Sequence, residues 1–565
     1  MDSCAWVLGI HIGHDRSVAV VQGGRLIGHL AEERMDRVKH SNSAELPKKA
    51  LRTLVRYLSL DLAKLRAVGI SYTNVEISKI IGQLTDEIRD ELGQPELDVF
   101  GCGHHRAHAL SAFHTSGFKD PFVLVADGAG DIVEGRLEAE TLYVAEGANA
   151  KIVEQRLQDF PSTRIDRRNA FNPAYMLASD GAKSISLGRK YEQFTYMIGF
   201  RHGEAGKAMG LASYAPPLFD PVVPSFSGIG FELRFADYLA EIDVWRNKAG
   251  LPWHKFVRTK AAEIASLSQI IAEGYVLQSL NNIAKEHGVR NLCLSGGLFL
   301  NCLLNHRILE TTPFSDLYVI PAAGDDGQSI GAAYHTWLAT GNTRVSSEES
   351  SPFLGLSYTT DEITAALQHF RLLYRRLPQR LLIERMARDL SEGKVIGLVR
   401  GRSESGPRAL CHRSILAHPG YTEIRDDLNR IKGREYFRPF APAVVAEQQF
   451  RYFELRARSP YMLLACAVRP EFRTKLAAVT HIDGTARIQA VDKAVDPFVH
   501  HLLCAFEQHS GVPVLLNTSF NLAGDPIVES PHDALAAFLG SSLDALILED
   551  FYIESRVPLA AKRLA

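Results

Sequence analysis

Residues 6–33 read WVLGIHIGHDRSVAVVQGGRLIGHLAEE and contain three runs rich in aliphatic and β-branched side chains. A GHD corner separates the first run from the second, and a QGGR turn separates the second from the third. Short apolar runs joined by glycine-containing turns are typical of antiparallel strands. The stretch therefore predicts a tight three-stranded meander.

A second copy of this pattern begins at Pro121. The runs PFVLVADGAGD, TLYVAEGANA and KIVEQRL repeat the order strand, glycine–aspartate corner, strand, glycine turn and strand. Further apolar runs predict later strands at residues 67–72, 291–297 and 316–326. Two meanders, each followed by helices and strands, predict a duplicated α/β domain with a cleft between its halves, toward which the strand-end loops face.

A second domain is expected beyond residues 339–352, ATGNTRVSSEESSP, which are polar, lack apolar periodicity and predict a linker. Helical stretches follow, then the apolar runs KVIGLVRG, VPVLLNTSF and DALILEDFYI, which predict strands. We therefore expect one domain over residues 1–345 and a second α/β domain over residues 346–565.

The composition excludes several classes of protein. With 565 residues, 46% of them hydrophobic and 23% charged, the chain is neither disordered nor a collagen-like fibre nor a coiled coil. The 63 basic and 65 acidic residues give a net charge of -2, so no nucleic acid or membrane partner is expected. Seven scattered cysteines without a CxxC pair, and the lack of a signal-like or membrane-spanning apolar run, predict a cytoplasmic protein.

Two histidines and two aspartates form a candidate metal site. His104 and His108 are four residues apart, so on a helix both imidazoles project from one face. Asp127 and Asp325 each follow an apolar run at a glycine corner. Such a set suits a divalent metal with positions left open for a phosphate oxygen. The alternatives are a solvated histidine pair and aspartates that cap turns.

Three glycine-rich corners, at residues 127–131, 294–301 and 323–331, could present backbone N–H groups to nucleotide phosphates. Plain turns are the alternative for each corner. Lys207, in the run HGEAGKAMGLASYA, is either another phosphate contact or an exposed lysine. The candidate nucleotide-binding residues are Gly128, Gly130, Lys207, Gly296, Gly297 and Asn301.

The first corner, GHDRS, contains His14 and Asp15. A histidine there could accept a proton from a hydroxyl group, with Asp15 beside it, although a hydrogen-bonded turn is the alternative. The nearby run AEERMDRVKHS, residues 31–41, clusters basic side chains that we interpret as a solvated rim.

Residues 401–440 hold seven arginines and one lysine against five acidic residues. Guanidinium groups from such a segment could converge on a phosphate or a carboxylate-like group. A basic outer surface is the alternative, but the run GPRALCHRS mixes arginine with small and apolar residues, which favours partly buried arginines. The candidate anion-binding residues are Arg408, Arg413, Lys432 and Arg438, followed by Arg487, Asn517 and Ser519.

Ordered motifs along nearly the whole chain resemble the O-carbamoyltransferase family of antibiotic biosynthesis, which includes the nodulation and nebramycin-type carbamoyltransferases. The motifs are GHDRSVAVV, LAEERMDRVKH, HHRAHALSAF, VADGAG, EAGKAMGLASY, LSGGLFLNCLLN, PAAGDDGQSIGAA, GRSESGPRALCHRS, YFRPFAP and LNTSFN. The resemblance implies an N-terminal domain of the actin-like ATPase (ASKHA) fold, similar to the universal tRNA threonylcarbamoyl-transferring protein. It implies a C-terminal domain that resembles the YrdC fold.

The resemblance also implies a two-stage reaction. The C-terminal domain converts carbamoyl phosphate and ATP to carbamoyl-adenylate, and the N-terminal domain transfers the carbamoyl group to an alcohol. The family's metal ligands match His104, His108, Asp127 and Asp325, with Fe²⁺ expected and Mn²⁺, Zn²⁺ or Mg²⁺ as alternatives. The proposed base matches His14. The carbamoyl phosphate and adenylate contacts match Arg408, Arg413, Lys432, Arg438, Arg487 and Ser519.

Two positions depart from the family pattern. Cys411 replaces a usual glycine, so the turn is expected to shift or the side chain to touch the carbamoyl pocket. Ile12 replaces an aspartate of the aminoglycoside enzyme, which favours a macrolide, polyketide or similar glycoside as the acceptor. We expect a small-molecule acceptor and a monomer or homodimer. Threonylcarbamoyl transfer to tRNA and a nucleotide-sensing actin-like module are the alternative functions.

Overall fold

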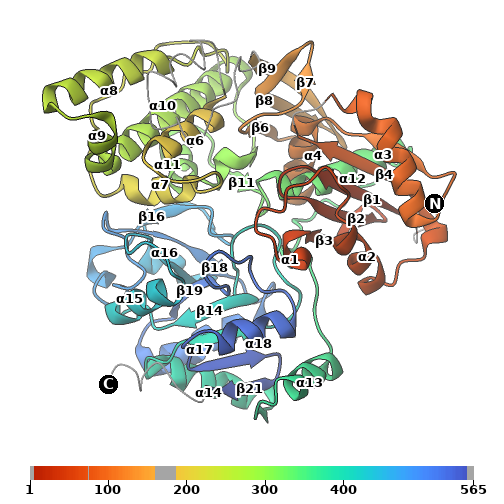
Figure 1. The fold of residues 1–565 in the computed structure, drawn as a ribbon, viewed down its shortest axis with the longest axis vertical. Helices are drawn as coiled ribbons and strands as arrows, with labels where there is room; N and C mark the ends of the chain where they lie inside the picture. Colours follow the sequence, from red (N-terminus) through yellow and green to blue (C-terminus); the bar gives the residue numbers. More distant parts are fainter. Residues whose placement is uncertain (1–4, 74–75, 159–185, 556–565) are drawn as a thin grey trace. The chain divides into compact units, whose positions relative to one another are not determined.

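The computed structural model describes residues 5–73, 76–158 and 186–555. These residues form two compact units, drawn in Figure 1. The first comprises residues 1–27, 42–47 and 60–350, and the second comprises residues 28–41, 48–59 and 351–565. Two short N-terminal segments thus group with the C-terminal part of the chain. The division into two functional domains at residue 345 stays a prediction.

The first sheet of unit 1 has the order β3-β2-β1-β4-β5. β1 is antiparallel to β2 and parallel to β4, and β4 is parallel to β5. Its strands are β1 (Trp6–Ile12), β2 (Ser17–Gln22), β3 (Arg25–Ala31), β4 (Leu65–Tyr72) and β5 (Asp98–Gly101). The predicted N-terminal meander is therefore confirmed as the start of a larger sheet.

Helix α12 (Gln328–Ala339) packs closely on this sheet, although it is distant in sequence, and its green ribbon lies among the red strands in Figure 1. Glycines make this approach feasible. A Cβ atom at Gly9 would lie 1.9 Å from the carbonyl oxygen of Ser329, and one at Gly69 would lie 2.3 Å from that of Ala332. Helix α4 (His104–Ser116) packs in turn against α12.

The second sheet repeats the first. Strand β6 is antiparallel to β8 and parallel to β10, β10 is parallel to β11, and β9 pairs with β8, so the order β9-β8-β6-β10-β11 matches β3-β2-β1-β4-β5. The strands are β6 (Phe122–Ala126), β7 (Ile132–Val133), β8 (Arg136–Glu146), β9 (Asn149–Gln158), β10 (Leu292–Ser295) and β11 (Leu317–Val319). This repetition confirms the duplicated actin-like fold.

Helices α6, α7, α9 and α11 pack against the long helix α10 (Ala261–His287), whereas α3 packs against β5. The bounds of these and the other helices of unit 1 are α3 (Ile77–Leu92), α6 (Leu187–Met197), α7 (Ala205–Ala212), α8 (Phe235–Ala249), α9 (Trp253–Thr259), α11 (Cys302–Thr311), η1 (Leu62–Lys64), η2 (Gly297–Leu300) and η3 (Asp325–Gly327). Within the described residues, no helix combines the length and apolar character that crossing a membrane requires.

Unit 2 is built on an eight-stranded mixed sheet of order β12-β21-β20-β13-β14-β19-β15-β18, which confirms the predicted α/β class. These strands are β12 (Arg375–Arg376), β13 (Ile396–Val399), β14 (Arg413–Ala417), β15 (Ala441–Val445), β18 (Gln489–Val491), β19 (Val514–Ser519), β20 (Ala545–Leu548) and β21 (Phe551–Glu554). β16 (Ala465–Ala467) pairs with β17 (Thr485–Arg487).

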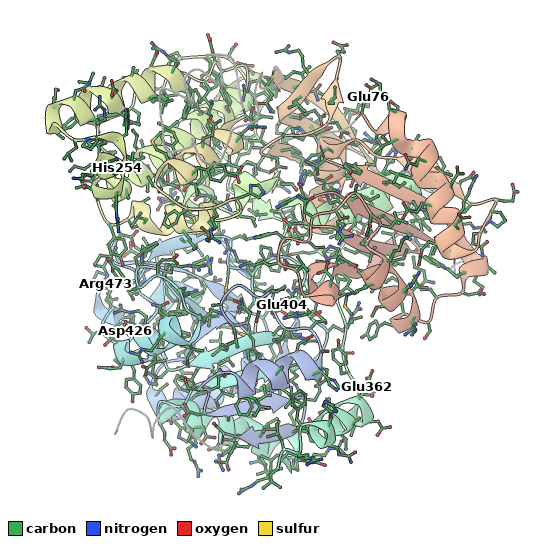
Figure 2. The ribbon with its side chains drawn as sticks, in the orientation of Figure 1. Glu76, His254, Glu362, Glu404, Asp426 and Arg473 are labelled. Carbon is green, nitrogen blue, oxygen red and sulfur yellow. The ribbon has the colours of Figure 1, made fainter. Side chains whose placement is uncertain are left out.

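The helices of unit 2 include α14 (Gln379–Ser391) and α17 (Pro497–Ser510), which pack together. Helix α13 (Thr360–His369) begins with a capping box, in which Thr359 N–H donates to Glu362 Oε2 at 2.7 Å and Glu362 N–H donates to Thr359 Oγ1 at 3.3 Å. Glu362 is labelled in Figure 2. The others are α1 (Glu33–Asp36), α2 (Lys48–Tyr57), α15 (Thr422–Ile431), α16 (Gln449–Tyr452), α18 (Pro531–Leu539), η4 (Ala446–Gln448) and η5 (Pro470–Phe472).

The segment around α1 corrects one interpretation. Arg34 is only 5% exposed, and its Nη1 lies 3.7 Å from Glu529 Oε2. Arg37 donates to the carbonyl oxygen of Ile527 at 2.7 Å. The expected solvated rim is therefore wrong for these side chains, because their charged groups are bound by carbonyl and carboxylate oxygens of the same unit.

Candidate functional site

Unit 1 brings the four predicted metal ligands together. His104 and His108 lie on α4, Asp127 follows β6, and Asp325 begins η3. One potential ligand atom from each side chain lies within 4.8 Å of those from the other three. The distances from His104 Nε2 to Asp127 Oδ2 and from His108 Nε2 to Asp325 Oδ1 are 3.2 and 3.3 Å.

The electrostatics of this cluster favour a bound cation. Burial would lower the pKa of His104, but Asp325 and Asp127 outweigh it and raise that pKa to about 10. Burial would raise the pKa of Asp127, yet its hydrogen bonds to His104 and His108 hold the pKa well below the usual value. Burial and the charge of Asp127 would raise the pKa of Asp325, but His104, His108 and His11 lower it below the usual value. Two imidazoles and two carboxylates thus form a donor set that fits a divalent metal.

Neighbouring groups fix the orientation of these side chains. Ser295 Oγ lies 3.1 Å from His108 Nδ1, and Thr73 Oγ1 donates to Asp325 Oδ2 at 3.1 Å. Gly297 N–H donates to Asp127 Oδ1 at 3.0 Å. Hydrogen bonds of this kind fix the tautomer of a metal-binding histidine and the orientation of a metal-binding side chain.

The residues of the predicted phosphate loops make contacts within unit 1. A Cβ atom at Gly296, where φ is +102°, would lie 2.2 Å from the carbonyl oxygen of Ala126. Asn301 caps α11 by accepting from Leu304 N–H. The N–H group of Gly297 donates to Asp127 Oδ1, as described above. Their role as nucleotide contacts stays a prediction.

The other candidate phosphate contacts are also engaged. The carbonyl oxygen of Gly128 accepts from Ser186 Oγ at 2.6 Å. A Cβ atom at Gly130 would lie 2.6 Å from the Cβ atom of Glu138. Lys207 Nζ lies 2.6 Å from Glu204 Oε1, one turn before it. These contacts account for the residues without a nucleotide, so binding here also stays a prediction.

His14 lies in a chain of polar groups. Its Nδ1 is 2.9 Å from Asp15 Oδ2, and its Nε2 is 3.1 Å from His202 Nε2. His202 Nδ1 is 2.9 Å from the hydroxyl oxygen of Tyr196 and forms an ion pair with Glu192. The sequence analysis missed His202, because it considered only Lys207 in the HGEAGK run.

The environment of His14 keeps the imidazole protonated at neutral pH. Burial would lower its pKa, but the hydrogen bond and charge of Asp15, together with Asp325 and Asp127, raise the pKa to about 9. Because the two facing Nε2 atoms need one proton between them to form a hydrogen bond, His202 is the immediate partner for proton exchange.

Unit 2 contains a cluster of four cations: Lys432, Arg434, Arg438 and Arg487. Burial and the charges of Arg434 and Arg438 lower the pKa of Lys432 well below its usual value. Burial and the charges of Arg438 and Arg487 likewise lower the pKa of Arg434. Such mutual repulsion is relieved by a bound anion. Arg434 was not among the predicted residues.

Lys432 is held at the end of β19. Its Nζ donates to Asn521 Oδ1 at 2.7 Å, to the carbonyl oxygen of Ser519 at 2.6 Å and to Ser519 Oγ at 3.2 Å. The structure thus brings Ser519 to the cation cluster. Asn517 instead lies in a buried group, where its Nδ2 donates to Gln489 Oε1 at 2.7 Å and lies 3.1 Å from Cys411 Sγ.

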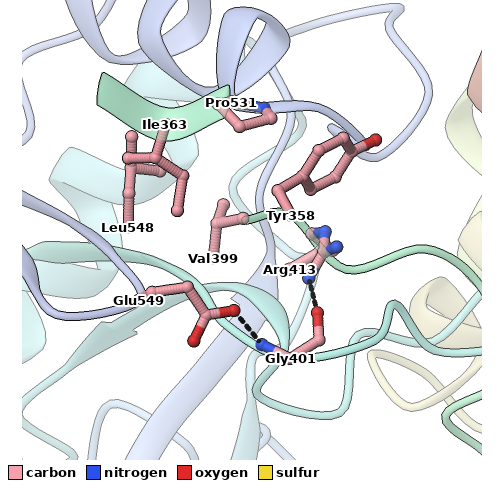
Figure 3. Close-up of a pocket in the computed structure, with 8 residues that line it drawn as sticks. All are labelled: Tyr358, Ile363, Val399, Gly401, Arg413, Pro531, Leu548 and Glu549. Carbon is pink, nitrogen blue, oxygen red and sulfur yellow. Dashed lines mark hydrogen bonds between the residues drawn. The ribbon is translucent and has the colours of Figure 1, made fainter. Parts of the chain in front are cut away.

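Arg413 is placed differently from the prediction. It is fully buried, and its guanidinium donates to five carbonyl oxygens, those of Leu356, Arg400, Gly401, His412 and Glu529. Figure 3 shows it beside Gly401 in a narrow pocket. This geometry favours a structural role over the predicted phosphate contact. Arg408 is half-buried in the preceding loop.

The structure shows the surroundings of Cys411 and Ile12, the two positions that depart from the family pattern. Cys411 keeps a left-handed backbone with φ of +74°, and its N–H donates to Ser414 Oγ at 2.9 Å, so the residue occupies a glycine-type turn despite its side chain. Ile12 is fully buried in β1. It therefore offers no surface to an acceptor, and the inference from Ile12 toward an apolar acceptor loses its basis.

The fold and these clusters define a two-unit α/β protein whose first unit is actin-like. A family model described as Carbamoyltransferase N-terminus matches residues 72–334, and one described as Carbamoyltransferase C-terminus matches residues 387–555. The chain belongs to the carbamoyltransferase family and is a carbamoyltransferase enzyme.

Three relatives illustrate the family. Nodulation protein NolNO of Sinorhizobium fredii (strain NBRC 101917 / NGR234) is 32% identical and covers 96% of this chain and 79% of its own length. Nodulation protein NolO of Bradyrhizobium diazoefficiens is 33% identical over 80% of this chain and 79% of its own length. The 3'-hydroxymethylcephem-O-carbamoyltransferase of Amycolatopsis lactamdurans is 35% identical over 46% of this chain and 48% of its own length.

Proposed function

We propose that this carbamoyltransferase is an ATP-dependent O-carbamoyltransferase. Unit 2 converts carbamoyl phosphate and ATP to carbamoyl-adenylate, and unit 1 transfers the carbamoyl group to a hydroxyl group of a natural product. The observation that carries the proposal is that each unit contains side chains suited to one of the two stages. Unit 2 contains a cation cluster for binding phosphate groups, and unit 1 contains a histidine–aspartate cluster and a separate histidine base.

The cation cluster supports the first stage. Carbamoyl phosphate and the phosphates of ATP are anions, and their binding offsets the repulsion among Lys432, Arg434 and Arg438. Arginine forks hold a phosphate in one orientation through paired hydrogen bonds. Water cleaves the bound carbamoyl phosphate to carbamate and inorganic phosphate, and these side chains orient the carbamate oxygen toward the α-phosphate of ATP, whose bond to pyrophosphate then breaks.

His14 supports the second stage. Its Nε2 accepts the proton of the acceptor hydroxyl while the new carbamoyl C–O bond forms and AMP leaves with the bonding electron pair. Asp15 holds Nδ1–H, so Nε2 is the nitrogen that takes up this proton, after its own proton has passed to His202. His202 is 42% exposed and exchanges the proton with solvent.

His104, His108, Asp127 and Asp325 would hold the metal ion, for which we propose Fe²⁺, with Mn²⁺, Zn²⁺ or Mg²⁺ as alternatives. When bound, the ion supplies positive charge that stabilises phosphate oxygens. The protein's own contribution is a buried donor set, oriented by Ser295, Thr73 and Gly297, that excludes bulk water.

The proposed acceptor is a small-molecule alcohol, and a natural product of the antibiotic type is what the family resemblance of the motifs implies. The name of the Amycolatopsis relative, which is a carbamoyltransferase for a hydroxymethyl group, supports an alcohol acceptor in general.

The test is a carbamoyl-phosphate-dependent release of pyrophosphate from ATP by the purified chain. We expect release only when carbamoyl phosphate is present, and transfer of ¹³C from labelled carbamoyl phosphate to a compound in an antibiotic-producer extract, detected by mass. Pyrophosphate release that ignores carbamoyl phosphate would exclude the adenylate stage. Labelled adenylate without any labelled ester or carbamate product would exclude the alcohol acceptor.

A further inference from the structure

Gln328, the first residue of α12, lies inside the histidine–aspartate cluster although it is not one of its four members. Its side chain is fully buried. Its Nε2 lies 2.9 Å from Asp325 Oδ1, 3.1 Å from His104 Nε2 and 3.3 Å from His108 Nε2. The terminal amide of Gln328 therefore faces three of the four potential ligand atoms at once.

The other atom of this amide is unsatisfied. Gln328 Oε1 is buried and has no hydrogen-bond partner among the residues that the structure describes. A buried carbonyl oxygen without a partner costs about 1–3 kcal/mol. A half-turn of the amide exchanges Oε1 and Nε2 without changing the shape of the side chain, and it places Oε1 where the three ligand atoms converge.

The distances match those between ligands of one ion. Ligand atoms about 2.1 Å from a small divalent metal lie about 3.0–3.4 Å apart in octahedral or tetrahedral geometry. The histidine Nε2 atoms lie 3.2–3.6 Å from the carboxylate oxygens of the two aspartates, and the Gln328 amide nitrogen lies 2.9–3.3 Å from three of these four ligand atoms. An amide oxygen is also a suitable ligand for such an ion.

We propose that Gln328 Oε1 is a fifth protein ligand of the metal held by His104, His108, Asp127 and Asp325. The inference rests on the proposed metal site and extends it. A fifth protein ligand would leave fewer positions on the bound ion for an oxygen atom of the substrate. In the opposing interpretation, Nε2 continues to donate to Asp325 and only orients that carboxylate.

The test measures Co²⁺ binding to the full chain after metal removal with a chelator. Gln328→Leu removes both amide atoms, and we expect it to weaken Co²⁺ binding by about 10-fold or more. Gln328→Glu keeps an oxygen at the same place and adds a charge, so we expect binding at least as tight as in the wild type. The matched control is Gln449→Leu, a fully buried glutamine in unit 2.

The visible spectrum of bound Co²⁺ distinguishes ligation from orientation, because its band positions and intensities follow the number and type of ligands. We expect Gln328→Leu to change the spectrum and Gln328→Glu to restore bands close to those of the wild type. A wild-type spectrum in Gln328→Leu, or weaker binding by Gln328→Glu, would overturn the proposal. If Gln328→Leu does not fold, the Co²⁺ affinity and spectrum of Gln328→Glu alone decide whether Gln328 is a ligand. If His104→Ala leaves Co²⁺ binding unchanged, the metal site itself has failed.

Discussion

Arg438 and its neighbours illustrate how single residues carry the proposed first stage. The pKa of Lys432 is lowered by burial and by the positive charges around it, and a bound anion would relieve this repulsion. Arg438 is about one-third exposed, which leaves part of its guanidinium accessible to a ligand. Glu435 Oε2 lies 4.0 Å from Arg438 Nη1.

We predict that Arg438→Ala reduces carbamoyl-phosphate-dependent pyrophosphate release by about 30-fold or more, since loss of a charged partner of a bound anion costs about 2 kcal/mol or more. The matched control is Arg430→Ala, because Arg430 is 76% exposed and pairs with Asp427 on the surface of α15. Equal rates for both variants in a pyrophosphate assay would remove Arg438 from the site.

His14 provides a pH-dependent prediction. Because its pKa is raised to about 9, His14 is protonated below that pH and cannot accept a proton. The transfer rate should therefore rise with pH until about 9, whereas pyrophosphate release should not follow this curve. Asp15→Asn removes the carboxylate that raises the pKa, so the midpoint should move to lower pH. The groups whose charge raises the pKa of His14 are Asp15, Asp325 and Asp127, and His202 Nε2 faces its Nε2 at 3.1 Å.

The measurement compares how two rates depend on pH: the rate of pyrophosphate release and the rate of carbamoyl transfer. Transfer is followed by mass spectrometry of the acceptor that carries the labelled carbamoyl group. His14→Ala should retain pyrophosphate release and lose transfer. If Asp15→Asn leaves the midpoint of the transfer profile in place, Asp15 does not control the protonation of His14.

At the scale of elements, the start of β14 shows why a motif alone did not assign Arg413. The run GPRALCHRS indicated buried arginines correctly, but it did not indicate which atoms satisfy them. The five carbonyl acceptors of Arg413 come from residues 356, 400, 401, 412 and 529, so they depend on how distant segments meet. Long-range contacts of this type are not encoded in local spacing.

We predict that Arg413→Met lowers the free energy of unfolding by about 3–5 kcal/mol, because it leaves Glu529 buried with one charged partner fewer. Urea unfolding followed by circular dichroism measures this loss. Arg402→Met, at a half-buried arginine of the same loop, is the comparison. A stable Arg413→Met protein that loses only carbamoyl phosphate binding would restore the predicted ligand role.

Other elements were predictable because their signals are local. The strands of both meanders are runs of β-branched and aliphatic residues with glycine turns, and β1 and β6 are fully buried. His104 and His108 share a helix face through their spacing, and Asp127 ends a strand. The position of Gln328 and the pairing of His14 with His202 were not predictable, because they join residues 188 or more positions apart.

At the scale of the whole molecule, the order of the sequence differs from the order of the compact units. Residues 28–41 and 48–59 belong to unit 2, whereas residues 42–47 between them belong to unit 1. The boundary predicted near residue 345 rests on the polar linker. The linker contains no signal that residues 28–41 and 48–59 group with the C-terminal part of the chain. The chain must therefore complete its C-terminal unit with residues synthesised early.

We predict that residues 351–565 do not fold stably alone and become stable when residues 28–59 are fused to them. In the chain, His29 Nδ1 lies 3.0 Å from Ser405 Oγ, and Tyr57 shares a 2.7 Å hydrogen bond with Ser357. Arg34 lies against Glu529, which is 1% exposed and would be left with one charged partner fewer. Removing a partner of a buried charge destabilises a protein by about 3–5 kcal/mol, a large fraction of a domain's stability.

The two proteins are compared by urea unfolding and by amide hydrogen exchange. The fused protein should unfold in one cooperative transition and protect the amides of β14 and β19, while residues 351–565 alone should show weak protection there. A fused protein in which Arg34→Met and Arg37→Met replace the anchoring side chains controls for the added length, and it should lose most of the gain. Equal stability with and without residues 28–59 would show that the N-terminal segments only rest on unit 2 and are not needed to complete it.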